Sequence, residues 1–137
     1  MSTTNQRLAG IFHQMADILQ LLEVDVFRVN AFRRVARVIE DSSFDLALIG
    51  PDAKKLMELE GVGKGMAERI IEFLKTGKIA EHEKLLSDVP AGLPALLGLQ
   101  GLGPKTVALL WKQAGVTDID SLKKKLDAGE LKDLPGM

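Results

Sequence analysis

A short glycine phrase occurs twice in this chain and carries its most specific chemical signal. The copies are Gly61-Val62-Gly63-Lys64-Gly65 and Gly101-Leu102-Gly103-Pro104-Lys105, and a third begins at Leu134-Pro135-Gly136-Met137. Glycine has no Cβ and tolerates positive φ, so the phrase allows a tight turn and close approach to a partner. A helix that begins at such a turn offers unpaired N–H groups and the positive end of its dipole, which bind a phosphate oxygen.

The sequence around each copy predicts a helix-hairpin-helix. Apolar residues 56–59 and 96–99 lead into the glycines, and a second helical pattern follows at 66–74 and 106–111. One copy alone would fit a helix that ends at glycine beside another that begins at proline. Two copies with the same pattern favour a repeated phosphate-binding hairpin. Because backbone N–H contacts to phosphate read no bases, the expected ligand is DNA without sequence preference.

A local excess of positive charge accompanies the hairpins. The chain has 18 Lys and Arg against 19 Asp and Glu, a net charge of −1 that argues against a strongly basic nucleic-acid binder. Residues 28–37, however, contain four arginines and no acid, and four more cations follow the first hairpin: Arg28, Arg33, Arg34 and Arg37, then Lys64, Arg69, Lys75 and Lys78. Exposed helix faces explain these runs, and so does a basic side that faces phosphates.

Composition limits the other functions of the chain. Its 137 residues suit one domain or two small subdomains, and the absence of cysteine excludes disulfides and thiolate metal sites. His13 and His82 have no third ligand at metal spacing, and His82 fits a solvated helix surface. There is no apolar window of about 18 residues and no signal-like N-terminus. We therefore expect a soluble, cytoplasmic protein with no membrane partner.

Apolar periodicity predicts an all-α fold. The spacing over residues 8–22 indicates one amphipathic helix with Thr3 or Thr4 as N-cap, and Asp25 caps a second helix. The core stripe expected for the second helix is Ala31, Phe32, Val35, Ala36 and Ile39. Shorter helices are expected at 45–49, 79–86 and 120–128, with Gly77 and Gly115 as helix ends. No alternating β-branched run occurs, so no strand is expected.

These patterns resemble the N-terminal region of family X (polymerase beta-like) DNA polymerases. The resemblance rests on motifs in matching order: Asn30-Ala31-Phe32-Arg33-Arg34-Val35-Ala36, Gly61-Val62-Gly63, Ala67-Glu68-Arg69-Ile70 and Thr76-Gly77-Lys78. It implies a lyase-type, eight-kilodalton-like domain over residues 6–88 with the first hairpin. A fingers-like subdomain over 89–137 would hold the second hairpin and the start of a third. The Val89-Pro90-Ala91-Gly92-Leu93 junction is most similar to the bacterial branch.

The family's later domains do not occur in this sequence. Bacterial members continue into a polymerase palm and usually a phosphoesterase domain, so no nucleotidyl transfer is assigned to this chain. The third hairpin is interrupted at Met137, so we expect a fragment of a longer parent with a palm domain, and a free-standing protein stays the alternative.

The resemblance also implies a site, residue by residue. In the family one hairpin grips the strand downstream of a gap and the other grips the primer strand. The implied phosphate donors are backbone amides of Gly61, Gly63, Gly65, Gly101, Gly103, Lys105 and Thr106. The basic runs add the side chains of Lys64, Arg69, Arg33 and Arg34 to the expected DNA-binding set. The family's 5′-phosphate pocket falls on Arg28 and Phe32, but Phe32 lacks a tyrosine hydroxyl and lies on the apolar stripe, which favours a core role.

Loop carbonyls hold a monovalent cation in family members. The matching carbonyls belong to Met57, Leu59, Val62, Leu97, Leu99 and Leu102. K+ or Na+ at these positions would offset carbonyl charge beside a phosphate, and water is the alternative occupant. No cofactor is required.

The family's lyase chemistry is where the sequence departs from the pattern. A Schiff base needs a neutral lysine amine, and the matching position is Arg69, whose guanidinium stays protonated. Two supporting lysines are replaced by Gly65 and Glu81. We therefore expect binding to gapped or nicked DNA, or to a single-strand/duplex junction, in base excision repair and in association with the bacterial nucleoid, without β-elimination.

Two alternatives stay open at this point. One is a weak lyase for abasic sites or 5′-deoxyribose phosphate that uses Lys64 or another lysine. The other is a helix-hairpin-helix protein-interaction module, which the net charge of −1 favours.

Overall fold

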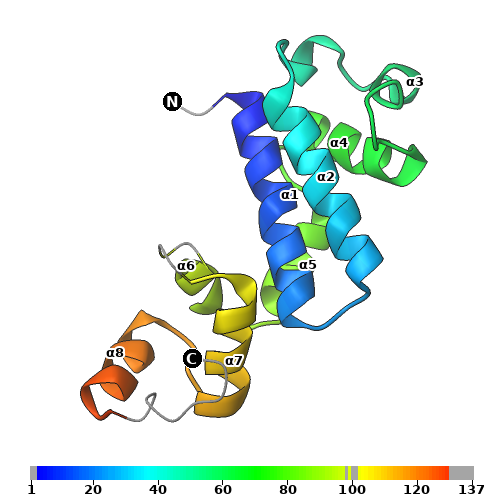
Figure 1. The fold of residues 1–137 in the computed structure, drawn as a ribbon. Helices are drawn as coiled ribbons and strands as arrows, with labels where there is room; N and C mark the ends of the chain where they lie inside the picture. The colour runs from blue at the N-terminus through cyan, green and yellow to red at the C-terminus, as the bar shows by residue number, and fades with distance from the viewer. Residues whose placement is uncertain (1–2, 98, 100–101, 130–137) are drawn as a thin grey trace.

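Helices joined by turns and loops make up the described chain, which is residues 3–97, 99 and 102–129 of a computed structural model (Figure 1). In order they are α1 (Thr4–Leu21), α2 (Val26–Asp41), the 3-10 helix η1 (Leu46–Leu48), α3 (Ala53–Leu56), α4 (Lys64–Thr76), α5 (Ala80–Ser87), α6 (Leu93–Leu97), α7 (Pro104–Ala114) and α8 (Ile119–Asp127). No strand occurs among these residues, and the all-α prediction is confirmed. The expected third hairpin at 134–137 lies outside them.

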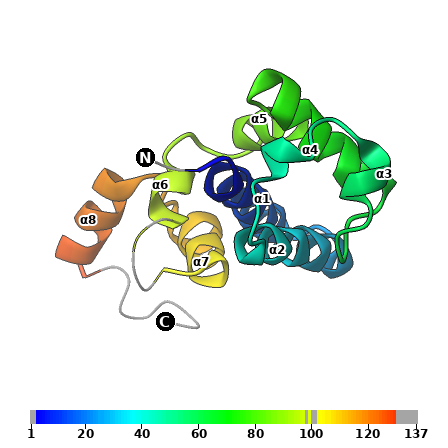
Figure 2. The same ribbon diagram turned by 90° about the horizontal axis from the view of Figure 1, so that it is seen from above.

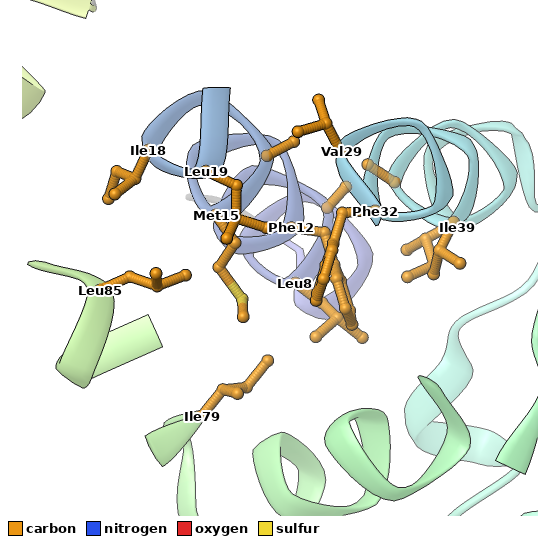
Figure 3. Close-up of a cluster of buried hydrophobic side chains, with 14 of the residues drawn as sticks. Leu8, Phe12, Met15, Ile18, Leu19, Val29, Phe32, Ile39, Ile79 and Leu85 are labelled. Atoms are coloured by element: carbon orange, nitrogen blue, oxygen red, sulfur yellow. The ribbon is translucent and has the colours of Figure 1, made fainter. Parts of the chain in front are cut away.

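An antiparallel pair, α1 and α2, supplies the centre of the core (Figure 1). Phe12 and Phe32 pack against each other with ring centroids 5.7 Å apart. Figure 3 shows this cluster closed from the opposite side by Ile79 and Leu85. The predicted stripe of α2 is confirmed except at Ala31, which is exposed.

Helix α1 contacts both halves of the molecule. It packs on α2 and α5 and also on α6 and α7. In Figure 2, α3, α4 and α5 lie on one side of α1, and α6, α7 and α8 lie on the other. The core therefore runs continuously from α2 to buried Val107 and Leu110 of α7.

Most helices begin and end at the capping residues predicted from the sequence. Thr3 caps α1 in a capping box with Gln6, and Asp25 caps α2 by accepting from the Phe27 N–H. The C-terminal residues of α4 and α7 are followed by Gly77 and Gly115 with φ of 78° and 69°. None of the described helices has the length and apolarity to span a bilayer.

His82 corrects one expectation. It is half-buried on α5, where its Nε2 lies 2.5 Å from Oε1 of Gln14 on α1. Burial lowers the pKa of His82 below its ordinary value, against a smaller opposing effect of the Glu83 charge. The predicted solvated surface position is therefore wrong.

Candidate nucleic-acid interface

The described residues of the two hairpin turns make the same backbone hydrogen bonds. In each, two short backbone hydrogen bonds turn the chain between the helices: Leu59 N to Leu56 O (3.1 Å) and Val62 N to Leu59 O (3.1 Å) in the first, Leu99 N to Leu96 O (3.1 Å) and Leu102 N to Leu99 O (3.2 Å) in the second. The first helix is shorter than predicted, because α3 ends at Leu56 and the turn begins there. Equivalent atoms thus recur 40 residues apart.

A glycine begins the second helix of each hairpin. Gly63 is the N-cap of α4 with φ −91° and ψ −172°, and Gly103 is the N-cap of α7 with φ −86° and ψ 172°. Both backbones are extended and open to any residue, and a Cβ added at either glycine meets no atom within 4 Å. The turn therefore does not require glycine at these two positions.

The missing side chain has an electrostatic consequence instead. Ser, Thr, Asp or Asn at an N-cap accepts from a first-turn N–H, as Asp52 does at the start of α3. Gly63 and Gly103 supply no such acceptor. Within the described part of the chain, the N–H groups at the start of α4 and α7 therefore meet no capping side chain and remain available to an external anion, at the positive ends of two helices.

Gly61 has a different role. Its φ of +81° lies in the left-handed region, and a Cβ there would lie 3.3 Å from Cδ of Arg34. The stem of Arg34 therefore packs on the first hairpin, while its guanidinium binds Glu60 at 2.7 Å on the exposed surface. Among the predicted glycines, Gly65 faces Arg69, and Gly101 lies outside the described residues.

The predicted cation carbonyls of the first hairpin are chemically suited to a monovalent ion. Leu59 O accepts from Val62 N, and within the described residues no backbone N–H donates to the carbonyls of Met57 or Val62. Neutral oxygen donors suit K+ or Na+ better than a transition metal, which prefers nitrogen or sulfur. No cluster of acidic, histidine or cysteine residues suited to a metal occurs in the described part. The carbonyls of Leu97, Leu99 and Leu102 flank residues outside that part, and both cation sites stay predictions.

Acidic residues neutralise the arginine-rich run of α2. Arg33 binds Asp17 of α1 at 2.8 Å, and Arg34 binds Glu60. Arg28 binds Glu81 of α5. The run that contains no acid in the sequence therefore meets three acids in space, and a uniformly basic face is not what the chain forms.

One cluster unites the residues that the resemblance assigned to a 5′-phosphate and lyase pocket. Glu81 binds Arg28 of α2 through Oε1 and Arg69 of α4 through Oε2, with Arg69 Nε at 2.8 Å and Nη2 at 2.6 Å. The Arg69 guanidinium lies 5.1 Å from the ring centroid of Phe32. Phe32 is fully buried, as its place on the apolar stripe predicted.

A groove of about 470 Å³ lies between α2 and the second helix of the second hairpin, α7. Arg33 and Asn30 line it from α2, and Lys105 and Lys112 line it from α7. Lys112, which binds Glu23 at 3.2 Å, was not among the predicted site residues. Its spacing of seven from Lys105, two helical turns, is the sequence signal that places both on one face.

Comparison with known proteins identifies the class. Residues 3–79 match the family described as helix-hairpin-helix domain, and residues 93–137 match the SAM-like helix-hairpin-helix tandem. The first match covers more than half of the chain, so this chain belongs to the helix-hairpin-helix domain family.

Two DNA polymerases are also similar in sequence to this chain. The DNA polymerase/3'-5' exonuclease PolX of Bacillus subtilis (strain 168) is 36% identical over 130 residues, and DNA polymerase lambda of Arabidopsis thaliana is 29% identical over 122 residues. Each alignment covers 88% of this chain and 22% of the relative. The predicted resemblance to family X polymerases, and to their bacterial members, is confirmed. The chain spans about a fifth of the length of these relatives.

Proposed function

We propose that this chain binds DNA through backbone phosphates and without sequence preference. The observation that carries the proposal is the pair of equivalent hairpins, each with a glycine N-cap that leaves helix N–H groups unpaired. Phosphate oxygens satisfy such groups and complement the helix dipole. The similarity to two DNA polymerases supports the same ligand.

The composition of the hairpin loops supports the absence of base recognition. Sequence is read by side chains that reach base edges, whereas backbone N–H groups contact phosphates alone. Gly61, Val62 and Gly63 carry no side-chain hydrogen-bonding group. Lys64 adds a flexible charge that suits any phosphate.

We further propose that the preferred DNA is gapped or nicked and carries a 5′-phosphate, as in base excision repair. Two anion-binding hairpins on opposite sides of α1 suit two separate strand segments (Figure 2). Arg28 and Arg69, on the side of the first hairpin, add a third cationic position. The proposal includes the division into a lyase-type unit, 6–88, and a fingers-like unit, 89–137, and a palm domain in a longer parent protein.

We do not extend the proposal to the lyase reaction. Arg69 occupies the position of the family's nucleophile, and its guanidinium is held by both Glu81 and the Phe32 ring. A guanidinium remains protonated and forms no imine. The proposed activity is therefore binding alone.

Fluorescence anisotropy on gapped DNA tests the proposal. Two unrelated sequences are expected to bind equally, and affinity is expected to fall with salt at a log-log slope of about −0.9 per phosphate neutralised on duplex. A tenfold preference between the sequences would refute the absence of base reading. Absent or salt-independent binding would instead favour a protein-interaction module.

A further inference from the structure

The Glu81 carboxylate occupies the centre of a cluster that suits an oxyanion. Its two oxygens bind two guanidiniums from different helices, Arg28 on α2 and Arg69 on α4. Two converging arginines are a common arrangement for binding a carboxylate or phosphate. The position between them is therefore an anion site that the chain fills with its own side chain.

The exposure of the three side chains shows which of them an external ligand reaches. Arg28 is 47% exposed, whereas Arg69 and Glu81 are 25% and 24% exposed. Arg69 is held further by the Phe32 ring beneath it, and a Cβ on Gly65 would lie 3.3 Å from its Nη1. An incoming anion thus meets Arg28 first, while Arg69 stays fixed at the back of the cluster.

Charge indicates which anion competes with Glu81. The two arginines carry +2 and the carboxylate carries −1, so the cluster keeps a net positive charge. An internal phosphodiester carries −1 and gains little by replacing a carboxylate of equal charge. A terminal phosphomonoester carries about −1.5 to −2 near pH 7 and offers three acceptor oxygens to the two guanidiniums.

We propose that Glu81 is an internal competitor that sets the affinity of the Arg28–Arg69 pair for a terminal 5′-phosphate on DNA. The inference rests on the proposed DNA binding and adds a residue that determines specificity within it. Glu81 lowers the affinity of the arginine pair for the terminal phosphate, because the phosphate must displace the Glu81 carboxylate before it binds both guanidiniums.

The test compares gapped DNA bearing a 5′-phosphate with the same DNA bearing a 5′-hydroxyl. Glu81→Gln removes the charge and keeps the side-chain shape and an acceptor oxygen. The preference for the 5′-phosphate is expected to rise about five- to thirtyfold, the effect of removing one like charge at a partly solvated contact. Arg28→Ala combined with Glu81→Gln is expected to abolish that gain.

Glu60→Gln is the matched control. Glu60 also binds an arginine, Arg34, and lies beside the first hairpin, but its side chain is 77% exposed and outside the cluster. The same change of charge there is expected to raise the affinity for both DNAs equally. Thermal unfolding of each variant confirms that the fold is kept.

The outcomes separate this inference from the proposed function. Equal gains on both DNAs with Glu81→Gln, or no change, would overturn the inference while DNA binding stands. A loss of 5′-phosphate preference would also overturn it, because Glu81 would then position the arginines for the phosphate. Failure of the wild-type chain to bind either DNA would refute the proposed function. Thermal stabilisation by inorganic phosphate over chloride at matched ionic strength, greater in Glu81→Gln than in the wild type, tests the anion site without DNA.

Should Glu81→Gln fail to fold, Arg28→Ala in the wild-type background supplies a second variant. Arg28 is half exposed, so its truncation leaves the core intact. The inference requires this variant to lose its preference for the 5′-phosphate. Equal binding losses on both DNAs would overturn it.

Discussion

Capping the first hairpin helix separates stability from DNA binding. In Gly63→Asp, the new carboxylate can accept from the first-turn N–H groups of α4 that we propose bind phosphate. The backbone at Gly63 is extended and its Cβ position is empty, so the substitution introduces no strain. We expect the folded state to gain stability while DNA affinity falls.

The two effects differ in size. Aspartate is a better N-cap than glycine by a few tenths of a kcal/mol, and a carboxylate at a helix N-terminus adds about 0.3–1 kcal/mol. Loss of one hydrogen bond to a charged phosphate removes about 1.5–3 kcal/mol of binding free energy. The dissociation constant for DNA is therefore expected to rise roughly 10- to 150-fold.

Two controls isolate the cause. Gly10→Asp makes the same charge change at an exposed glycine of α1 whose Cβ position is also empty, and it is expected to change affinity little. Gly63→Ala adds a Cβ without an acceptor and is expected to bind DNA like the wild type. Anisotropy gives the affinity and urea unfolding gives the stability. Unchanged affinity in a stabilised Gly63→Asp variant would refute phosphate binding at this helix end.

Two further predictions concern the lyase position and pH. Borohydride is added together with 5′-deoxyribose-phosphate DNA to trap any Schiff base as a covalent adduct. We expect no adduct on the wild-type chain and only a trace on Arg69→Lys. A robust wild-type adduct, mapped by mass spectrometry to Lys64 or another lysine, would establish the lyase alternative. Because burial lowers the pKa of His82 in the folded state, the unfolded chain binds more protons near pH 6, and the free energy of unfolding should fall as pH drops through about 6.5. His82→Gln should flatten this dependence in urea titrations, and a folded-state His82 pKa at or above 6.5 by NMR would contradict it.

Local patterns predicted the helices and their ends because the responsible interactions are local. The caps at Thr3 and Asp25 and the glycines after α4 and α7 act within one turn of the helix that they end. The hairpin repeat could also be predicted, because its first two glycines occupy the same positions in both copies. What the pattern missed was the early end of α3 at Leu56, where apolar residues continue into the turn.

The ion pairs of the site could not be predicted from local sequence patterns. Arg28 and Glu81 are 53 residues apart, and Arg34 and Glu60 are 26 apart. These pairs exist only because the fold brings α2 within reach of α5 and of the first hairpin turn, and nothing in residues 28–37 indicates it. The resemblance implied a 5′-phosphate pocket at Arg28 and Phe32 and, separately, lyase positions at Arg69 and Glu81. That the Glu81 carboxylate bridges Arg28 and Arg69 required the structure.

The packing of both hairpin halves on α1 bears on the geometry of any DNA that they share. A straight helix of 18 residues is about 27 Å long and does not stretch. Because α5 of the first half and α6 and α7 of the second half pack on α1, the two halves are joined through a rigid rod rather than by a flexible tether alone. Phosphates that fit one hairpin then define where the other can bind along the strands. For the gapped DNA that we propose as ligand, the width of the gap, more than its sequence, would then determine how well both hairpins bind at once.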